Sequence, residues 1–170
     1  TYLDMYNEYT AMKEMYKKEC RRGLKGDEAN KEIENIEGFF RDNLDKGFSD
    51  LQLFLDLLLT ELQKGKKIQL TIRGYASPLA KTDYNINLTL RRISSLINYI
   101  KTVDDGVFAS YMNINAKNRG HLSLLKIPLG EHRADASVSS NLADKRSSVY
   151  SRAAALERKI EITSVDLDKK

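Results

Sequence analysis

The sequence is poor in the residues that build metal, redox and disulfide sites. Among its 170 residues there are one cysteine, two histidines, two prolines and no tryptophan. Cys20 stands alone, which excludes a disulfide within the chain and a Cys-x-x-Cys redox motif. Cys20, His121 and His132 are also too few ligands for a dedicated zinc site of the usual kind. We expect no metal and no organic cofactor.

Long hydrophobic runs are absent too. No segment approaches the roughly 20 apolar residues that a membrane-spanning helix needs. The longest candidate, residues 51–62, is interrupted by four polar residues and predicts an amphipathic core helix. No signal-peptide pattern stands at the start. Because the first residue is Thr1, we expect a part of a longer chain, with any export signal upstream.

Charge of neither sign dominates. The chain carries 28 Lys and Arg against 24 Asp and Glu residues, for a net charge of +4, and its basic pairs are scattered. Nucleic-acid-binding proteins concentrate positive charge on one face, so the pattern argues against a nucleic-acid partner. With 41% hydrophobic and 31% charged residues, the chain is expected to be globular. A mild positive charge can still favour an anionic polymer.

Residues 1–30 are predicted to form an N-terminal helical extension. Aromatic and methionine residues recur there at spacings of three and four: Tyr2, Met5, Tyr6, Tyr9, Met12, Met15 and Tyr16. We expect this stripe to pack on the rest of the domain or on preceding chain rather than to bind a ligand. Residues 20–31 are charged and contain two glycines, which predicts a loop or partly mobile link.

Residues 31–165 are predicted to form one domain, and residues 166–170 a charged tail that frays. A short helix within 30–46 is expected to end before Gly47. A second helix, capped by Ser49 or Asp50, runs to about residue 64, where Gly65 stops it.

Alternating apolar residues predict strands over 67–73, 121–127 and 158–163, the second of them ended by Pro128. A helix capped by Thr82 or Asp83 lies between the first two and runs to about residue 101. A short helix is expected near 109–113, a long loop over 131–152 and a helical turn near 153–158. This order predicts an α/β (α+β) sandwich: a mixed sheet with helices on one face.

The loop after the first predicted strand, residues 74–81, has small residues and lies ahead of a helix N-terminus, which favours an anion. On that helix Asn85, Leu88 and Arg92 are three and four residues apart and share a face. A guanidinium can hold a carboxylate through two parallel hydrogen bonds, so the pattern predicts a carboxylate site. The competing interpretation is a structural ion pair between Arg92 and a nearby acid.

These residues carry a family resemblance. The string GYAS at 74–77, followed by Tyr84-Asn85, Leu88-Thr89 and Arg91-Arg92-Ile93, resembles the signature of OmpA-like C-terminal peptidoglycan-binding domains. That signature has a Gly-His-Thr-Asp loop, then Tyr-Asn, Leu-Ser and an Arg pair. Residues 155–162, ALERKIEI, are similar to the family's closing Asn-Arg-Arg-Val-Glu-Ile strand. The two matches together span roughly residues 48–163.

The resemblance implies a βαβαβ-type mixed sheet that binds the diaminopimelate residue of the peptidoglycan stem peptide non-covalently. In the family, a loop Asp meets the ligand's ammonium group and a helix Arg meets its carboxylate. Here Arg92 keeps the carboxylate role, Leu88 the apolar wall, and Asn85 braces the loop or meets the ligand's edge. The implied ligand-binding residues are Tyr75, Ala76, Ser77, Asn85, Leu88, Arg92 and Arg158.

The chain departs from the family pattern in two places. Ser77 stands where the family has its Asp, so a formal negative charge is missing; Asp83 and Glu131 are the candidate replacements. The family also has a strand with an acidic ligand-contacting residue before its first core helix, and residues 1–30 show no equivalent. That strand either lies upstream, or the N-terminal helix is an insertion following it; without it, a sheet edge is exposed.

The motif variants are most similar to the Bacteroidetes branch of the family. This implies a periplasmic lipoprotein, associated with the outer membrane through upstream chain. It would anchor an outer-membrane-associated complex of type IX secretion, a protein transport system, to the cell wall. The implied partners are peptidoglycan and other secretion-system or outer-membrane proteins.

Two other function classes compete with this one. A hydrolase would need an activated nucleophile, but Ser77 lies in GYASP, which lacks the Gly-x-Ser-x-Gly pattern, and no acid pairs with either histidine. We therefore do not expect an enzyme. The alternative function is a protein–protein interaction module of a secretion assembly, which keeps the fold and uses the N-terminal stripe and the 131–152 loop for docking.

Overall fold

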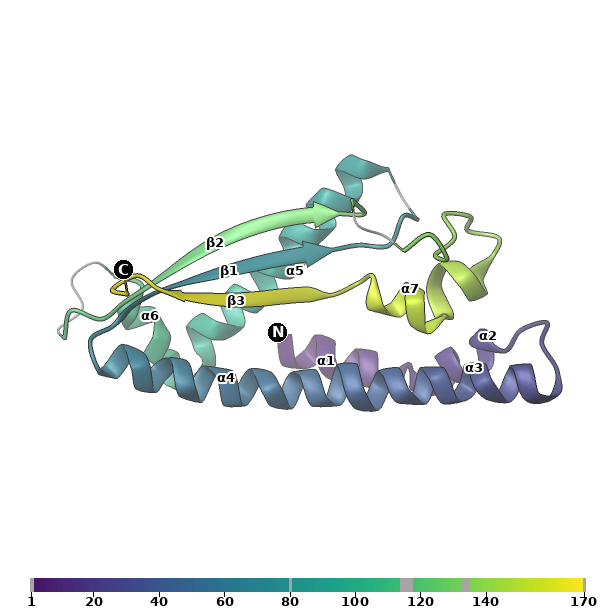
Figure 1. The fold of residues 1–170 in the computed structure, drawn as a ribbon, viewed down its shortest axis with the longest axis horizontal. Coiled ribbons are helices and arrows are strands. Elements are labelled where there is room, and N and C mark those ends of the chain that lie inside the picture. Colours follow the sequence, from purple (N-terminus) through teal and green to yellow (C-terminus); the bar gives the residue numbers. More distant parts are fainter. Residues whose placement is uncertain (1, 80, 114–117, 133–134, 170) are drawn as a thin grey trace.

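The computed structural model describes residues 2–79, 81–113, 118–132 and 135–169, and it shows a mixed α/β fold (Figure 1). The helical elements are α1 (Tyr2–Ala11), α2 (Lys13–Cys20), α3 (Gly26–Phe39), the π-helix η1 (Phe40–Asp45), α4 (Lys46–Gln63), α5 (Thr82–Thr102), the 3-10 turn η2 (Val103–Gly106), α6 (Val107–Tyr111), the π-turn η3 (Arg146–Tyr150) and α7 (Arg152–Leu156). The strands are β1 (Lys67–Tyr75), β2 (His121–Gly130) and β3 (Ile160–Asp166).

The sheet is mixed, with the order β2-β1-β3. β1 lies in the centre, parallel to β2 and antiparallel to β3. The three predicted strands are thus confirmed, but each is longer than expected or shifted. Pro128 was expected to end the second strand, yet β2 runs on to Gly130. The prediction was wrong because β2 is an edge strand among the described residues, and an edge tolerates a residue without an N–H on its open side.

One face of the sheet carries the main hydrophobic core. Ile68, Leu70 and Ile72 alternate along β1, and all three are buried. They pack with residues of α4, α5, α6 and β2, namely Leu51, Leu55, Leu58, Leu62, Ile93, Leu96, Ile97, Ile100, Phe108 and Leu122. The other face includes the exposed residues Leu125 and Val165. The amphipathic core helix predicted over residues 51–62 is therefore confirmed, although Phe54 of α4 is only partly buried.

Residues 26–63 form one unbroken run of helix through α3, η1 and α4, seen as the long rod along the bottom of Figure 1. The expected loop over 20–31 is therefore wrong beyond residue 25, and the expected interruption at Gly47 is wrong as well. A glycine inside a helix disfavours it by only about 1 kcal/mol, which the burial of the flanking apolar residues outweighs. Because α4 continues directly from η1, neither Ser49 nor Asp50 caps a helix start.

The N-terminal helices pack against this rod through a second, aromatic core. Its buried members are Tyr16, Cys20, Ile36, Phe39, Phe40 and Ala155. Tyr6 stacks on Phe48 with 4.3 Å between ring centroids. The packing role expected for the tyrosine stripe is confirmed, whereas Met5, Met12 and Met15 of the same stripe are exposed. The predicted domain boundary after residue 30 falls inside α3 and stays a prediction.

The C-terminal segment is tied to β1 beyond the point where a frayed tail was expected. The Leu167 amide donates a hydrogen bond to the Lys67 carbonyl at 2.8 Å, and the Asp168 carboxylate accepts one from the Lys67 amide at 3.1 Å. Fraying is therefore wrong for residues 166–168. The described residues ahead of β1 contain no strand. None of the described helices is long and apolar enough to cross a membrane.

The unbroken helix gives a direct stability test at Gly47. A Cβ added at this residue would meet nothing within 4 Å. We expect Gly47→Ala to raise the free energy of unfolding by about 0.5–1 kcal/mol, because alanine favours the helix and restricts the unfolded chain. Urea denaturation followed by circular dichroism measures the change.

The matched control is Gly65→Ala, just past the end of α4. Gly65 has a φ of +83°, and a Cβ there would lie 2.9 Å from the Asn118 carbonyl oxygen. This variant should lose stability. A loss of stability in Gly47→Ala as well would contradict a helix that continues through this residue.

Candidate functional site

β1 and β2 finish at the same end of the sheet, beside α7 in Figure 1. The predicted site residues Tyr75 and Ala76 lie at this end. The Ala76 amide donates a hydrogen bond to the Gly130 carbonyl at 2.8 Å, and the Tyr75 amide donates one to the Lys159 carbonyl at 3.0 Å. These bonds hold the end of β1 between the end of β2 and the residue before β3. The two amides are consequently not free to bind an anion, contrary to what the small residues of the loop suggested.

Most of the predicted site residues are buried rather than open to solvent. Tyr75, Ala76, Ser77 and Asn85 are at most 7% exposed, whereas Leu88 is half-buried on the same face of α5. Thr82 and Asp83 were expected to cap α5, but the N-cap residue is Lys81, with no capping side chain. The Thr82 hydroxyl donates instead to Glu131, at 2.6 Å.

Arg92 is half-buried and reaches the end of β1. Its Nη1 lies 3.4 Å from the Tyr75 carbonyl oxygen, a long hydrogen bond. Burial lowers the pKa of Arg92, and the positive charge of Arg158 lowers it further. Among the described residues no carboxylate lies within 4 Å of this guanidinium. The competing interpretation, a structural ion pair at Arg92, therefore has no support in this part of the chain.

Arg158 is the second cation of the site, and the N-terminal helices hold it. Its Nη2 donates to the Val149 carbonyl at 2.7 Å and to the Tyr16 hydroxyl at 2.9 Å. The hydroxyls of Tyr9 and Tyr16 lie 2.9 Å apart. Sequence reasoning missed these two tyrosines as site residues, because their spacing indicates burial and says nothing of what their hydroxyls contact.

Tyr75 faces β3. Its hydroxyl donates to Glu161 Oε2 at 2.8 Å, and the Lys159 ammonium lies 5.0 Å from its ring centroid. The hydrogen bond from Tyr75 is the largest cause that lowers the pKa of Glu161 below its usual value. Lys159 also pairs with this carboxylate, at 3.2 Å. Tyr75 thus braces β3 against β1 at the edge of the site.

Glu131 is an acid that lies next to the loop after β1. It directly follows Gly130, whose carbonyl accepts the Ala76 amide hydrogen bond. Burial raises the pKa of Glu131, but hydrogen bonds from the Thr82 hydroxyl, the backbone and the Asn85 side chain, together with the nearby His132, outweigh it. The pKa is therefore lowered from its usual value, and the group is a carboxylate at neutral pH. Its second oxygen, Oε2, is buried and has no hydrogen-bond partner in the described part of the chain. Asp83, the other candidate for the missing loop charge, is exposed.

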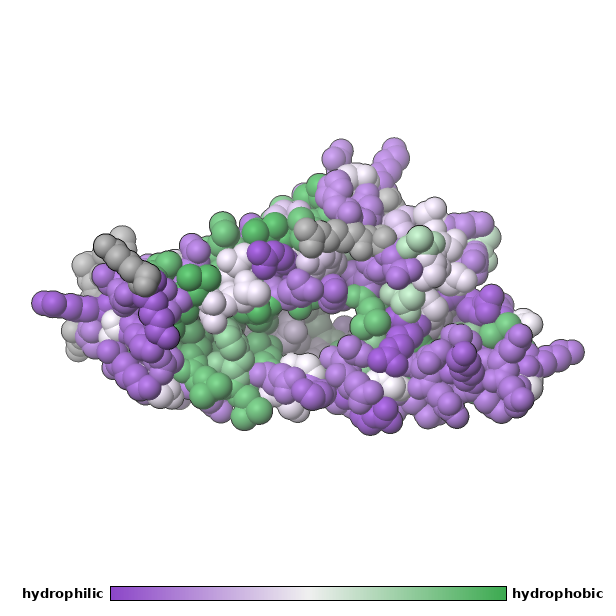
Figure 2. All heavy atoms as spheres, viewed as in Figure 1, coloured by the Kyte–Doolittle hydropathy of each residue, from purple (hydrophilic) through white to green (hydrophobic). Residues whose placement is uncertain are grey.

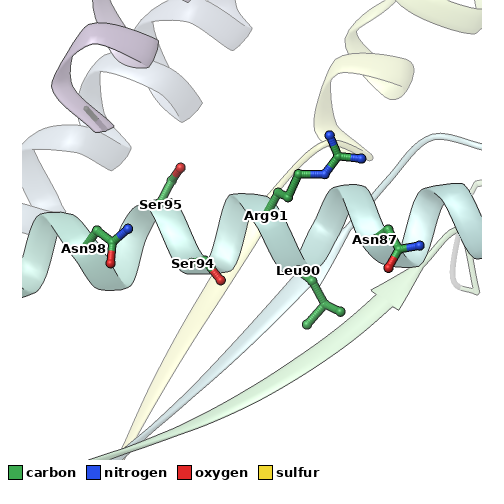
Figure 3. A pocket seen from close by; sticks show the side chains of 6 residues that line it. All are labelled: Asn87, Leu90, Arg91, Ser94, Ser95 and Asn98. Carbon is green, nitrogen blue, oxygen red and sulfur yellow. The ribbon is translucent and has the colours of Figure 1, made fainter.

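A hollow of about 570 Å³ lies elsewhere, on the outer surface of α5 (Figure 3). Six residues of this one helix line it: Asn87, Leu90, Arg91, Ser94, Ser95 and Asn98. At about 100° per residue, five of these positions lie at least about 100° around α5 from both Asn85 and Arg92, whereas Ser95 lies about 60° from Arg92. In Figure 3 the side chains spread outward from the helix rather than converge on one point. A surface of this kind does not enclose a ligand, so we place the candidate site at the two arginines.

The described residues contain no group of three or more His, Cys, Asp or Glu side chains that could hold a metal ion. Comparison with known proteins adds no relative: no family profile, no curated protein and no solved structure matches the chain.

The contact between Tyr75 and Glu161 can be tested through the acid's titration. Tyr75→Phe removes the hydroxyl donor, so the pKa of Glu161 should rise toward its ordinary value. Because a lowered carboxyl pKa stabilises the fold above the unfolded-state pKa, and this stabilisation is lost as pH falls through the folded-state pKa, the variant should also be less resistant to acid. Carboxyl-carbon NMR titration measures the shift.

Tyr84→Phe is the matched control, because Tyr84 is exposed on α5. It should leave the Glu161 titration in place. An unchanged Glu161 pKa in Tyr75→Phe would mean that the hydroxyl does not bond this acid in solution.

Proposed function

We propose that this chain is an OmpA-like peptidoglycan-binding domain, which binds the diaminopimelate-containing stem peptide non-covalently. One observation above all supports the proposal: Arg92 is half-buried at the end of the sheet, and no carboxylate of the described residues lies within 4 Å of it. Lys and Arg are rarely buried without a partner. A ligand carboxylate would supply that partner.

The surroundings of Arg92 suit a carboxylate at the end of a peptide side chain. Its only hydrogen bond to a described residue is the long one to the Tyr75 carbonyl, which leaves most of its five N–H groups available. Leu88, one turn earlier on α5, is half-buried and offers an apolar wall for the ligand's methylene carbons. Ala76 adds no side chain that would fill the space. The carboxylate would bind through two parallel hydrogen bonds.

The ammonium group of the ligand needs a negative partner, and Glu131 is our choice for it. Ser77 is neutral and buried, so it cannot supply the charge of the family's Asp. Glu131 lies beside the loop, is ionised, and keeps one buried oxygen without a partner among the described residues. An unpaired buried carboxylate oxygen is unfavourable until a donor reaches it. In this proposal Glu131, at the end of β2, supplies the negative charge that the OmpA-like family has in its loop.

The proposal also covers the fold family of the chain and its location in the cell. The order β1-α5-β2 followed by β3 in a mixed sheet is compatible with the βαβαβ core of the OmpA-like family. The role would be to anchor an outer-membrane-associated complex, of type IX secretion, to the cell wall from the periplasm. The site offers binding groups and no activated nucleophile among the described residues, so we propose a binding domain rather than an enzyme.

A second candidate function is a protein–protein interaction module in such an assembly. The observation in its favour is an apolar area over α4, visible in Figure 2, where Leu53 and Leu57 are 62% and 67% exposed. Two leucines one turn apart on an open helix face suit a docking partner. The two functions are compatible, because α4 and the arginine site are different parts of the molecule.

Removal of Arg92 is the decisive test of peptidoglycan binding. Arg92→Ala should weaken binding to purified insoluble sacculi by about 2–4 kcal/mol, the range for a hydrogen-bonded buried charge, which is roughly 30- to 1,000-fold. Co-sedimentation of the protein with sacculi measures the fraction bound, and circular dichroism checks the fold.

Arg91→Ala is the control, because Arg91 is exposed, lies about 100° around α5 from Arg92 and carries the same charge. It should sediment as the wild type does. If the wild type itself remains in solution, the domain does not bind peptidoglycan. The protein–protein interaction module is then the proposed function that remains.

Glu131 has its own test. Glu131→Gln keeps the shape and the hydrogen bond from Thr82 but removes the charge, so it should weaken binding of stem peptides with a free ammonium group by roughly tenfold. Peptides in which this amine is acetylated should bind wild type and variant equally. Isothermal titration calorimetry separates the two cases. Equal loss for both peptides would assign Glu131 a structural role only.

A further inference from the structure

The N-terminal helices supply part of the candidate site, although sequence reasoning treated them as an extension outside the domain. Tyr16 of α2 is 2% exposed, and its hydroxyl accepts a hydrogen bond from Arg158 Nη2 at 2.9 Å. Tyr9 of α1 lies behind it, with 2.9 Å between the two hydroxyl oxygens. The Arg158 guanidinium also lies 6.0 Å from the Tyr16 ring centroid. A long, flexible side chain is thereby fixed in one position.

The hydrogen bonds of Arg158 use only one of its three guanidinium nitrogens. Its Nη2 donates to the Val149 carbonyl at 2.7 Å and to the Tyr16 hydroxyl at 2.9 Å, and it makes a longer contact of 3.5 Å with the Tyr9 hydroxyl. The Nε and Nη1 groups, which carry the other three of the five N–H donors, bond to no described residue. Because each two-donor edge of a guanidinium includes Nη2, a ligand carboxylate would accept one charge-assisted hydrogen bond here, from Nε or from Nη1.

Arg92 and Arg158 both lie near Tyr75, at the end of β1. Arg92 Nη1 is 3.4 Å from the Tyr75 carbonyl oxygen, and the Tyr75 amide bonds to the carbonyl of Lys159, the residue after Arg158. No carboxylate of the described residues lies within 4 Å of either guanidinium. Two half-buried like charges repel each other, and negative charge from a ligand would relieve the repulsion.

We propose that Arg92 and Arg158 together bind two carboxylate groups of one ligand, and that Tyr16, supported by Tyr9, positions Arg158 for this role. The inference rests on the proposed function and narrows its ligand. The preferred stem peptide is one that ends at the diaminopimelate residue, because both carboxylates of that residue are then free. One carboxylate binds at each guanidinium, and the helices α1 and α2 are required for the second.

The probes are pimelate, a dicarboxylate with the carbon skeleton of diaminopimelate, and heptanoate, its monocarboxylate analogue. We expect pimelate to bind the wild type about tenfold more tightly, since it makes a second charge-assisted contact, and to shift the side-chain Nε–H NMR signals of both arginines. Tyr16→Phe keeps the aromatic packing but removes the hydroxyl. It should reduce the preference to about twofold and leave the Arg158 signal unshifted by pimelate.

Tyr2→Phe is the matched control, because Tyr2 is a partly buried tyrosine of the same N-terminal helices that packs on Tyr99 instead. It should keep the full preference for pimelate, as the wild type does. Arg158→Gln should abolish the preference and leave heptanoate binding at Arg92. Equal binding of pimelate and heptanoate by the wild type would overturn the two-carboxylate site. An undiminished preference in Tyr16→Phe would overturn the positioning role of Tyr16.

Sedimentation with sacculi separates this inference from the proposed function. If the wild type sediments but shows no preference for pimelate, peptidoglycan binding stands and the two-carboxylate site fails. If the preference is present but the protein stays in solution, the two-carboxylate site stands and its natural ligand is another dicarboxylate.

Discussion

The position of β1 in the centre of the sheet is the constraint on which the rest of the structure depends. Its inner residues, Ile68, Leu70 and Ile72, are buried among α4, α5 and β2, and both neighbouring strands take their register from it. Because β2 is parallel to β1 and α5 crosses between them, the end of β1, the end of β2 and the start of α5 lie together. The candidate site exists because three chain segments are brought to one end of the sheet.

The two arginines at that end of the sheet lower the stability of the fold. Arg92 and Arg158 carry like charges, lie in a half-buried setting, and have no acid of the described residues within 4 Å. A core residue in either position would stabilise the chain more, since charged groups are buried favourably only when they are paired. Groups whose free energy is unfavourable without a partner are characteristic of binding sites. The energetic argument for a ligand thus stands apart from the sequence resemblance.

The sequence predicts the parts of the fold that depend on periodicity. The β1 alternation, the core face of α5 and the end of α4 at Gly65 follow from apolar spacing and from a glycine with positive φ. The unbroken helix over 26–63 does not, because an exposed Gly47 disfavours a helix only slightly while tertiary packing stabilises it. At the site, the face shared by Asn85, Leu88 and Arg92 is predictable. The contact between Tyr16 and Arg158 is not, since 142 residues separate the two and no local rule connects them.

The aromatic core connects the N-terminal helices to the site, because it holds Tyr16 in contact with Arg158. Tyr16 packs edge-on against Phe40 and Tyr150, and its hydroxyl accepts a hydrogen bond from Arg158. Burial raises the pKa of Tyr16 far above its usual value, which keeps the hydroxyl protonated and able to bond Tyr9 while it accepts from Arg158. A neutral acceptor holds a guanidinium in place without neutralising it. A carboxylate in the same position would hold Arg158 more tightly and would leave no charge for a ligand.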